Sequence, residues 1–357
     1  MNGADAGFRG GSAQVAKDAK PHGVSVSPTI AVVIPAFRVA NLVLGVVREI
    51  GPEVQLIYVV DDACPEGSGS VVQAQCSDPR VTVINRASNG GVGAAVMTGY
   101  SAALRDGADI IVKLDGDGQM DARLIADFVG PIANGQADYT KGNRFYNLEG
   151  LERMPRVRLL GNAALSLMSK VSSGYWDIFD PTNGYTAVHA NIARDLPLAK
   201  ISSRYFFETD LLFRLNLMRA VVWDVPMQAR YGDEVSNLHI SHIAGEFLMK
   251  HLRNTFKRIF YNYYLRDVSI ASLELVLGLV LVMGGSAHGI FHWVQSASLG
   301  ITTPAGTVML ATLPILVGLQ LLLAFVNYDI GTVPRRPLHV TMNAVRRSDW
   351  RKDRDAS

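Results

Sequence analysis

A stretch of 54 residues, from Leu275 to Tyr328, contains no Lys, Arg, Asp or Glu. A membrane-spanning helix needs roughly 20 apolar residues, so this stretch is long enough for two spans, at about 268–290 and 305–327. The piece between them, 296–304, is rich in Ser, Thr, Gly and Pro and predicts a short turn. A buried helical hairpin is the weaker alternative, because core helices rarely lack charge on every face. The sequence therefore predicts a transmembrane hairpin.

Basic residues flank both predicted spans, whereas the turn between them has no charge. They are Lys250, Arg253, Lys257, Arg258 and Arg266 before the first span, and Arg335, Arg336, Arg346, Arg347, Arg351, Lys352 and Arg354 after the second. Because basic flanks stay on the cytoplasmic side, we expect an inner (cytoplasmic) membrane protein with two spans, with everything before the first span in the cytoplasm. Residues 241–266 mix basic with aromatic and aliphatic side chains. They predict an amphipathic helix that lies on the membrane surface or packs on the preceding domain.

These segments define the predicted domain organisation. Residues 1–28 are predicted to form a tail without an apolar signal segment, 29–240 a cytoplasmic domain, 241–266 the membrane-surface region, 267–328 the hairpin and 329–357 a basic cytoplasmic tail. The net charge is only +2, from 34 Lys and Arg against 32 Asp and Glu, which argues against nucleic acid as a partner. Two cysteines cannot build a disulfide framework or a four-cysteine zinc site.

Within 29–240, short apolar runs alternate with segments of helical spacing. The predicted strands are 30–34, 54–60, 81–84, 108–114 and 138–141, and the predicted helices are 39–50, 66–75, 91–106 and 121–133. This alternation predicts an α/β fold with a mostly parallel sheet covered on both faces. Ligands of such sheets bind at the carboxyl ends of the strands, and polar residues gather there in this chain.

The sequence LDGDGQMD, residues 114–121, follows one of these strands. Asp115, Asp117 and Gln119 alternate along it, so their oxygen atoms can converge on one hard cation such as Mg²⁺ or Mn²⁺. An acidic turn with Asp121 as a helix N-cap is an equally good interpretation of this segment alone. A Ca²⁺ loop is disfavoured because the downstream Glu and the EF-hand spacing are absent.

Two further candidate ligand-binding segments lie at the ends of predicted strands. SNGGVGAAVMTGY, residues 88–100, opens a helix with glycines that let the backbone approach an anion. It is a poor dinucleotide fingerprint, because the third glycine is displaced and the segment follows the third strand. Asp61 and Asp62 end the second strand, where a carboxylate can accept hydrogen bonds from a nucleobase or simply start a turn.

Together these motifs resemble family 2 glycosyltransferases of the GT-A fold. In order they are IPAF (34–37), VVDD (59–62), NGGVGAA (89–95), LDGDGQMD (114–121) and KGNRF (141–145). The D-x-D-x-Q form, with DPTNGYTAV (180–188), DVPMQARYGDEVSNL (224–238) and two C-terminal spans, is similar to the polyprenyl-phosphate branch. That branch includes dolichol-phosphate mannose synthase and bactoprenol glucosyltransferases. Five motifs in this order are far more specific than any one of them.

The resemblance implies roles for particular residues. Pro35, Ala36, Asp61, Asp62, Gly93 and Asp115 would line the nucleotide site, while Asp115, Asp117 and Gln119 would hold the metal on the diphosphate. Arg144 and Arg158 would engage the acceptor phosphate, with Arg156 as a competitor for the second position. Arg230 and Ser236 would lie on a loop over the donor. Glu208 and Asp210 match the place of a catalytic acid in relatives that act on hydroxyl acceptors, and they are sugar-binding or structural residues otherwise.

The implied reaction is inverting transfer of one sugar from a nucleotide-sugar (UDP- or GDP-linked) to a polyprenyl monophosphate at the bilayer, with Mg²⁺ or Mn²⁺ as cofactor. The resemblance also implies a homo-oligomer, a tetramer. A processive polysaccharide synthase is a weaker alternative, because the chain has no Q-x-x-R-W motif and only two predicted spans. A catalytically inactive membrane scaffold is disfavoured by the intact Asp115, Asp117 and Gln119 set.

Overall fold

The structure, a computed structural model, describes residues 27–146, 156–228 and 240–342, without the side chains of 156–160 and 240–244. The strands are β1 (Ile30–Ala36), β2 (Leu56–Asp61), β3 (Val81–Asn85), β4 (Ile110–Lys113), β5 (Tyr139–Asn143), β6 (Thr186–His189) and β7 (Val222–Pro226). The helices before the hairpin are α1 (Val43–Glu49), α2 (Ser68–Gln75), α3 (Val92–Arg105), η1 (Ala122–Leu124), α4 (Ile125–Ala133), α6 (Arg156–Ser173), α7 (Ala190–Asp195), η2 (Leu198–Lys200), α8 (Phe207–Met218), α9 (Ile240–Phe260) and the π-helical η3 (Tyr261–Arg266).

The strands form one mixed sheet in the order β3-β2-β1-β4-β6-β5-β7. Four neighbouring pairs are parallel, and the two pairs that involve β6 are antiparallel. The prediction of a mostly parallel sheet is therefore confirmed. Because β2 and β4 lie on opposite sides of β1, the chain reverses direction across the sheet there. A crevice opens at the carboxyl ends of strands at such a reversal.

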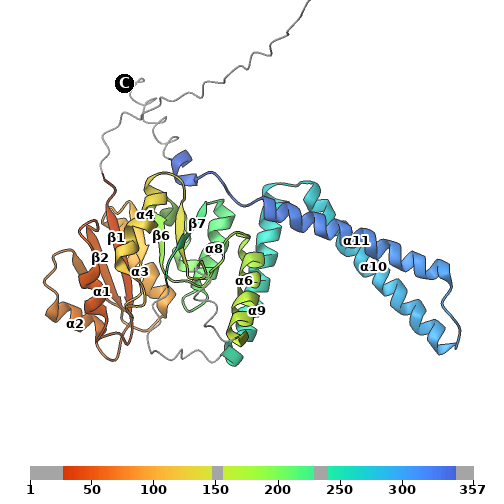
Figure 1. Ribbon diagram of the computed structural model, residues 1–357, viewed down its shortest axis with the longest axis horizontal. Coiled ribbons are helices and arrows are strands. Elements are labelled where there is room, and N and C mark those ends of the chain that lie inside the picture. The colour runs from red at the N-terminus through yellow and green to blue at the C-terminus, as the bar shows by residue number, and fades with distance from the viewer. Residues whose placement is uncertain (1–26, 147–155, 229–239, 343–357) are drawn as a thin grey trace, which may run out of the picture.

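Helices cover both faces of the sheet, as predicted (Figure 1). One apolar core lies between the sheet and α1, α2 and α4, and the other between the sheet and α3, α7 and α8. The strands alternate their side chains between these two cores, so Val32 and Val33 are both fully buried but belong to different cores. Such a sheet has no solvated face, which explains the continuous apolar runs in its strands.

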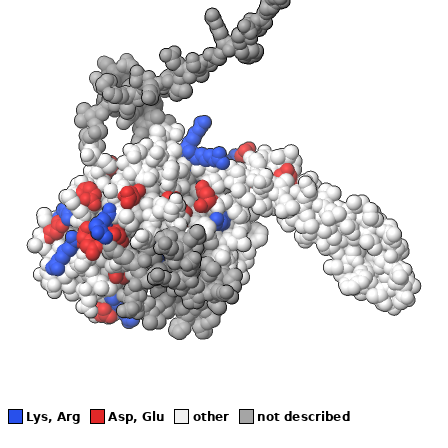
Figure 2. Space-filling model, viewed as in Figure 1, with Lys and Arg blue, Asp and Glu red and all other residues white. Residues whose placement is uncertain are grey.

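Two long helices, α10 (Ile270–Ser298) and α11 (Ala305–Gly331), project from this domain as a hairpin (Figure 1). Both are long and apolar enough to cross a membrane. They pack closely through small residues, since a Cβ on Gly278 would lie 3.1 Å from the Gly318 carbonyl oxygen. The first helix continues eight residues beyond the predicted end at 290, because the polar residues up to Ser298 stay helical. Figure 2 shows the outer part of the hairpin without charged residues on the visible face.

The base of the hairpin is joined to the domain by buried polar contacts. Arg258 of α9 donates to both carboxylate oxygens of Asp329, at 2.6 and 3.0 Å. The same carboxylate accepts hydrogen bonds from Tyr263 at 2.6 Å and from Trp176 at 2.8 Å. With four donors, the carboxylate of Asp329 is fully satisfied although it is only 3 % exposed. We refer to Trp176, Arg258, Tyr263 and Asp329 as the joint.

The chain after α11 returns to the sheet, which differs from the prediction of a tail from residue 329. Val333, Leu338 and Met342 pack against the core that contains α3 and α8. The buried carboxylate of Asp138 accepts hydrogen bonds from the backbone of residues 338 and 339 and contacts the His339 ring at 2.7 Å. Residues 333–342, the returning segment, therefore tie the second candidate membrane helix back to the start of β5.

Candidate active site

A cleft of about 800 Å³ lies at the carboxyl ends of β1, β2 and β4. The parallel register places Ala36 beside Asp61 and Val33 beside Lys113, so residues that follow these strands emerge at one edge. Among the predicted site residues, those that line this cleft are Pro35, Ala36, Asp62, Asp115, Asp117 and Glu208. The cleft is also lined by Asn89, Gly91 and Val92, from the glycine segment at the start of α3.

The two aspartates that end β2 have different surroundings. The carboxylate of Asp62 accepts hydrogen bonds from the backbone N–H of Gly90 at 3.0 Å and of Gly91 at 2.7 Å, and also from Arg86. It therefore fixes the glycine segment at the rim of the cleft. The carboxylate of Asp61 accepts from the backbone of Cys64 and Gly69, at 2.7 and 2.6 Å. Asp61 is not among the residues that line the cleft, and its contacts hold the turn between β2 and α2.

The glycines at the start of α3 allow the backbone to pass close to the segment before α8. Gly91 has a φ of +90°, and a Cβ there would lie 2.7 Å from the Ser203 carbonyl oxygen. A Cβ on Gly93 would lie 2.7 Å from the Cβ of Phe207. Gly93 was predicted to line the nucleotide site, but in the structure it packs against α8 and does not line the cleft. In this segment, Gly91 rather than Gly93 lines the cleft.

A smaller cavity of about 140 Å³ adjoins the cleft and shares Asp115, Asp117 and Glu208 with it. Gln119 and Arg144 also line the smaller cavity. The backbone N–H of Gln119 donates to Asp117 at 3.0 Å, which fixes the turn after β4. The structure thus brings together all three predicted metal ligands, at the boundary between two cavities. Their oxygen donors suit a hard divalent cation.

Lys113, the last residue of β4, is a residue of this site that the sequence analysis missed. Its ammonium lies 2.7 Å from a carboxylate oxygen of Asp115 and 3.9 Å from one of Glu208, and its side chain is 2 % exposed. A Cβ on Gly184 would lie 2.7 Å from Asp115, so glycine at this position leaves room for the pair. The available signal was a lysine inside an apolar strand run, directly before the acidic motif and two residues before Asp115. A buried lysine is rare unless it is paired.

Glu208 and Asp210 lie in the first turn of α8 but face different surroundings. Glu208 reaches both cavities, and burial raises its pKa to about 7, against the opposing effect of Lys113 and Lys141. Asp210 accepts hydrogen bonds from Ser202 at 2.9 Å and from Arg214 and Asn254, each at 3.3 Å, and lines neither cavity. This geometry favours the structural interpretation of Asp210. The raised pKa and the position of Glu208 favour a role in chemistry.

A second buried lysine, Lys141 of β5, contacts Asn183, a residue that lines the smaller cavity. Its ammonium donates to the carbonyl of Asn183, and burial lowers its pKa to about 8 despite the nearby carboxylates of Glu208 and Asp180. Asp224 lies close by and has its pKa raised to about 6, mainly by burial. Several buried titratable groups of both signs thus lie close to one another near the smaller cavity. Their positions are fixed before any ligand binds.

Arg144 lines the smaller cavity and forms a bidentate ion pair with Asp180, with contacts of 2.7 and 3.0 Å. The pair leaves one third of the Arg144 side chain exposed. Asp180 is almost fully buried, so it holds the guanidinium at the cavity wall. Arg156 and Arg158 begin α6, although their side chains are outside the described set. Arg230 and Ser236 lie outside the described residues.

Comparison with known proteins shows the family of this chain. Residues 31–196 match the family model described as "Glycosyl transferase family 2". An undecaprenyl-phosphate mannosyltransferase from Micrococcus luteus is 30 % identical over 200 residues, which cover 55 % of this chain and 81 % of the relative. A UDP-N-acetylglucosamine–dolichyl-phosphate N-acetylglucosaminyltransferase from Methanococcus voltae is 26 % identical over 218 residues, 57 % of this chain and 86 % of the relative.

Among solved structures, glucosyl-3-phosphoglycerate synthase from Mycobacterium tuberculosis, in complex with Mn²⁺, UDP and glucosyl-3-phosphoglycerate, is similar, with a TM-score of 0.49. It is 19 % identical and the match covers 65 % of this chain and 80 % of that one.

The family model and the mannosyltransferase relative define the class of this protein, a sugar-transferring enzyme. The chain belongs to glycosyl transferase family 2. Its catalytic domain is therefore the GT-A domain that the motifs predicted, followed by two candidate membrane-spanning helices.

Proposed function

We propose that this glycosyltransferase moves one sugar from a nucleotide-sugar to a polyprenyl monophosphate, giving a polyprenyl-phosphate sugar and a nucleoside diphosphate. The observation that carries the proposal is the pair of adjoining cavities that share Asp115, Asp117 and Glu208. One is large enough for a nucleotide, and the other presents an arginine. The names of the relatives support a lipid phosphate as acceptor. The two apolar helices support a membrane location for that acceptor.

The larger cleft suits the nucleotide. Pro35, Ala36 and Phe37 form one wall, and the glycine segment held by Asp62 forms another. Apolar walls with a few fixed polar groups are typical of small-molecule sites. The base would lie near the ends of β1 and β2, and the diphosphate near Asp115 and Asp117. UDP and GDP donors both remain compatible with this arrangement.

Asp115, Asp117 and Gln119 fit a divalent cation by their chemistry and by their shared cavity wall. In the described residues, no group of three or more His, Cys, Asp or Glu side chains is arranged to hold a metal, so further ligands would come from the donor diphosphate. When bound, Mg²⁺ or Mn²⁺ would neutralise negative charge on the leaving diphosphate. Lys113 places a second positive charge beside Asp115 and would contribute to the same neutralisation.

The smaller cavity suits the acceptor phosphate and the sugar. A phosphate monoester has a second pKa near 6, so the acceptor is largely a dianion at neutral pH and needs orientation more than deprotonation. Arg144, held in place by Asp180, offers planar guanidinium donors, and Arg158 remains the predicted second arginine. The bond from the anomeric carbon to the diphosphate breaks as the bond to the acceptor phosphate oxygen forms. We expect inversion at that carbon.

The proposal includes topology and assembly. The basic flanks support a catalytic domain on the cytoplasmic side of the inner membrane. Exposed apolar residues on α9, namely Leu248, Met249, Leu252, Phe256 and Phe260, suit contact with the membrane surface. We also propose a homo-oligomer, a tetramer by resemblance to the polyprenyl-phosphate branch.

A transfer assay tests the proposal. The full-length protein in membranes is given a panel of nucleotide-sugars with either polyprenyl phosphate or the unphosphorylated polyprenol, and lipid products are measured by mass spectrometry. We expect one added sugar on the phosphate only. Long glycan products would favour a processive synthase, and no product with any donor would favour an inactive scaffold.

A further inference from the structure

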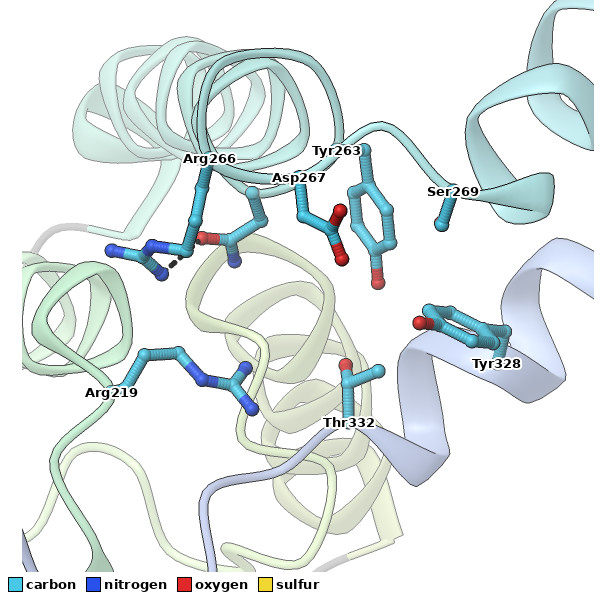
Figure 3. A pocket seen from close by; sticks show the side chains of 8 residues that line it. Arg219, Tyr263, Arg266, Asp267, Ser269, Tyr328 and Thr332 are labelled. Atoms are coloured by element: carbon cyan, nitrogen blue, oxygen red, sulfur yellow. Dashed lines mark hydrogen bonds between the residues drawn. The ribbon is translucent and has the colours of Figure 1, made fainter.

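A polar cavity of about 200 Å³ lies at the base of the hairpin, away from the catalytic cleft. Figure 3 shows Arg219 reaching into it from the end of α8, with Arg266 and Asp267 above it and Tyr328 and Thr332 at the end of α11. The cavity touches the link into the first apolar helix and the exit from the second. It therefore lies at the level where the candidate membrane spans begin and end.

The side chains of the two arginines that line this cavity differ in their hydrogen bonds. Arg266 donates to Asn262 at 3.1 Å and to the carbonyl of Leu217, so its guanidinium is fixed. Arg219 has no hydrogen bond or ion pair from its side chain within the described part of the chain. With Asp267, the cavity has a formal charge of +1, because the neighbouring Arg258–Asp329 pair is neutral. Arginines at a membrane boundary attract lipid phosphates.

The backbone at Arg219 supports a role for its side chain. Arg219 ends α8 in the left-handed conformation, with a φ of 66° and a ψ of 29°. Glycine is the usual residue at this position of a helix end, because any Cβ costs free energy in that conformation. A long cationic side chain at a position that favours glycine points to a function outside the backbone. The only cavity that Arg219 lines among those described is this one.

We propose that this cavity binds the head group of an anionic phospholipid, with the phosphate on the side of Arg219 and Arg266 and head-group hydroxyls toward Asp267. Asp267 disfavours a bare anion but can accept hydrogen bonds from hydroxyl groups. A phosphodiester that carries free hydroxyls, such as phosphatidylglycerol, satisfies both requirements. Arg219 and Glu208 lie at opposite ends of α8. A lipid bound at Arg219 would therefore help to hold this helix, and with it the catalytic domain, against the hairpin.

Lipid binding to the full-length protein in detergent tests this proposal. Phosphatidylglycerol, phosphatidylcholine or inorganic phosphate is added, and bound lipid is measured by native mass spectrometry together with the thermal unfolding midpoint. Arg219→Asn removes the charge but tolerates the left-handed backbone, and we expect it to lower phosphatidylglycerol retention about fivefold. Arg253→Asn removes an exposed charge from α9 outside the cavity and should retain the lipid as the parent does.

A second variant separates folding from binding. Arg219→Gly relieves the backbone, so its unfolding midpoint without lipid should equal or exceed that of the parent while the response to phosphatidylglycerol is lost. Equal losses in Arg219→Asn and Arg253→Asn would mean diffuse attraction and overturn the proposal. Retention of the response in Arg219→Gly, or an equal response to inorganic phosphate, would overturn it as well. Equal retention of phosphatidylcholine would overturn the assignment of Asp267 to head-group hydroxyls.

Discussion

The catalytic cleft and the joint at the base of the hairpin both contain buried charges, but the two regions are built differently. In the cleft, Lys113, Asp115 and Asp117 lie within five positions of each other and face open cavities. In the joint, Asp329 is bound by residues that are 66 to 153 positions away in the chain, and its carboxylate has four donors. One region keeps its polar groups available to ligands, and the other satisfies them internally.

This difference predicts which property each region controls. A polar group that faces a cavity contributes to stability only weakly, since water replaces its ligand when the site is empty. A buried group with several partners contributes strongly, because its removal leaves those partners unsatisfied. Substitutions in the cleft should therefore reduce turnover and preserve the fold, whereas substitutions in the joint should do the reverse.

The largest effect is expected for Asp117→Asn. Loss of a carboxylate at the boundary of the two cavities should lower sugar transfer by about 10³-fold, the scale of removing a strong electrostatic group from an active site. The thermal unfolding midpoint should stay close to that of the parent. Chelation with EDTA should abolish transfer, and Mg²⁺ or Mn²⁺ should restore it. Undiminished turnover in excess EDTA would refute the metal assignment.

A matched variant in the same turn serves as the control. Asp121 caps η1 and pairs with Arg123 at the surface. Asparagine is as good an N-cap as aspartate, so Asp121→Asn should leave both turnover and stability nearly unchanged. A large loss of activity in this variant would mean that the whole acidic turn, rather than the predicted ligands, is required.

The next effect belongs to the joint. Asp329→Asn should destabilise the protein by about 3 kcal/mol, because it leaves the buried guanidinium of Arg258 without its counter-charge. The measurement is thermal unfolding in detergent, with transfer activity assayed well below the midpoint. Glu246→Gln removes an exposed ion pair with Lys250 and should leave the midpoint almost unchanged. If Asp329→Asn instead lowers activity with an unchanged midpoint, the comparison between the two regions fails.

A smaller effect on turnover is expected for the arginines. Arg144→Lys keeps the charge but loses bidentate geometry, and it should lower transfer about tenfold, the equivalent of one charge-assisted hydrogen bond. We expect the same of Arg158→Lys. Both should raise the acceptor concentration needed for saturation more than they weaken donor binding. Parental rates at all acceptor concentrations would make that arginine an ordinary surface charge, and for Arg158 would make Arg156 the next candidate.

The comparison also explains how much could be predicted from the sequence. The strand ends of the cleft were predictable because each is one local run followed by its polar residues, and parallel strands bring such runs to one edge. The hairpin was predictable because its lack of charge is a property of composition. The partner of Arg144 was not, since Asp180 lies 36 positions away and sequence periodicity carries no information about such pairs.

The motifs also predicted a place in the nucleotide site for two residues that do not line the cleft. Asp61 and Gly93 lie inside recognisable motifs, yet one ties a turn and the other allows close packing against α8. Lys113 lies outside the motif boundaries but contacts its first aspartate. The returning segment was missed for another reason. Its contact with Asp138 spans about 200 positions, and its basic composition resembles that of an exposed tail.

The smallest predicted effect is on the pH dependence of folding, and it compares the cleft with the returning segment rather than with the joint. His189 stacks on His339 of the returning segment, and burial lowers its pKa to about 4. A histidine whose pKa is lowered on folding stabilises the protein fully above its unfolded pKa, near 6.5, and loses that contribution as the pH falls toward 4. His251 has the same shift and the same sign.

In the cleft, the contribution of the titrating groups to stability changes with pH in the opposite direction. The pKa of Glu208 is raised to about 7, so its contribution is fully present below the unfolded pKa, near 4.5, and is lost as the pH rises toward 7. Asp224, with its pKa raised to about 6, adds to this trend. Between about pH 4.5 and 6.5 the two regions should therefore oppose each other, and the unfolding free energy of the parent protein should change little.

Single substitutions should reveal the two slopes. His189→Asn keeps an N-cap acceptor for the backbone N–H of Asn191 but does not titrate, so the unfolding free energy of this variant should fall as the pH rises through the window. Glu208→Gln removes the opposing group, so its unfolding free energy should rise with pH. In each variant the unfolding free energy should change by about 1 kcal/mol per pH unit, measured by denaturant titration without metal or donor. Because the two changes have opposite signs, a general effect of acid on the protein cannot produce both. Equal slopes in the two variants would mean that these residues do not titrate as their surroundings require, and that the charges of the cleft and those of the returning segment are not balanced against each other.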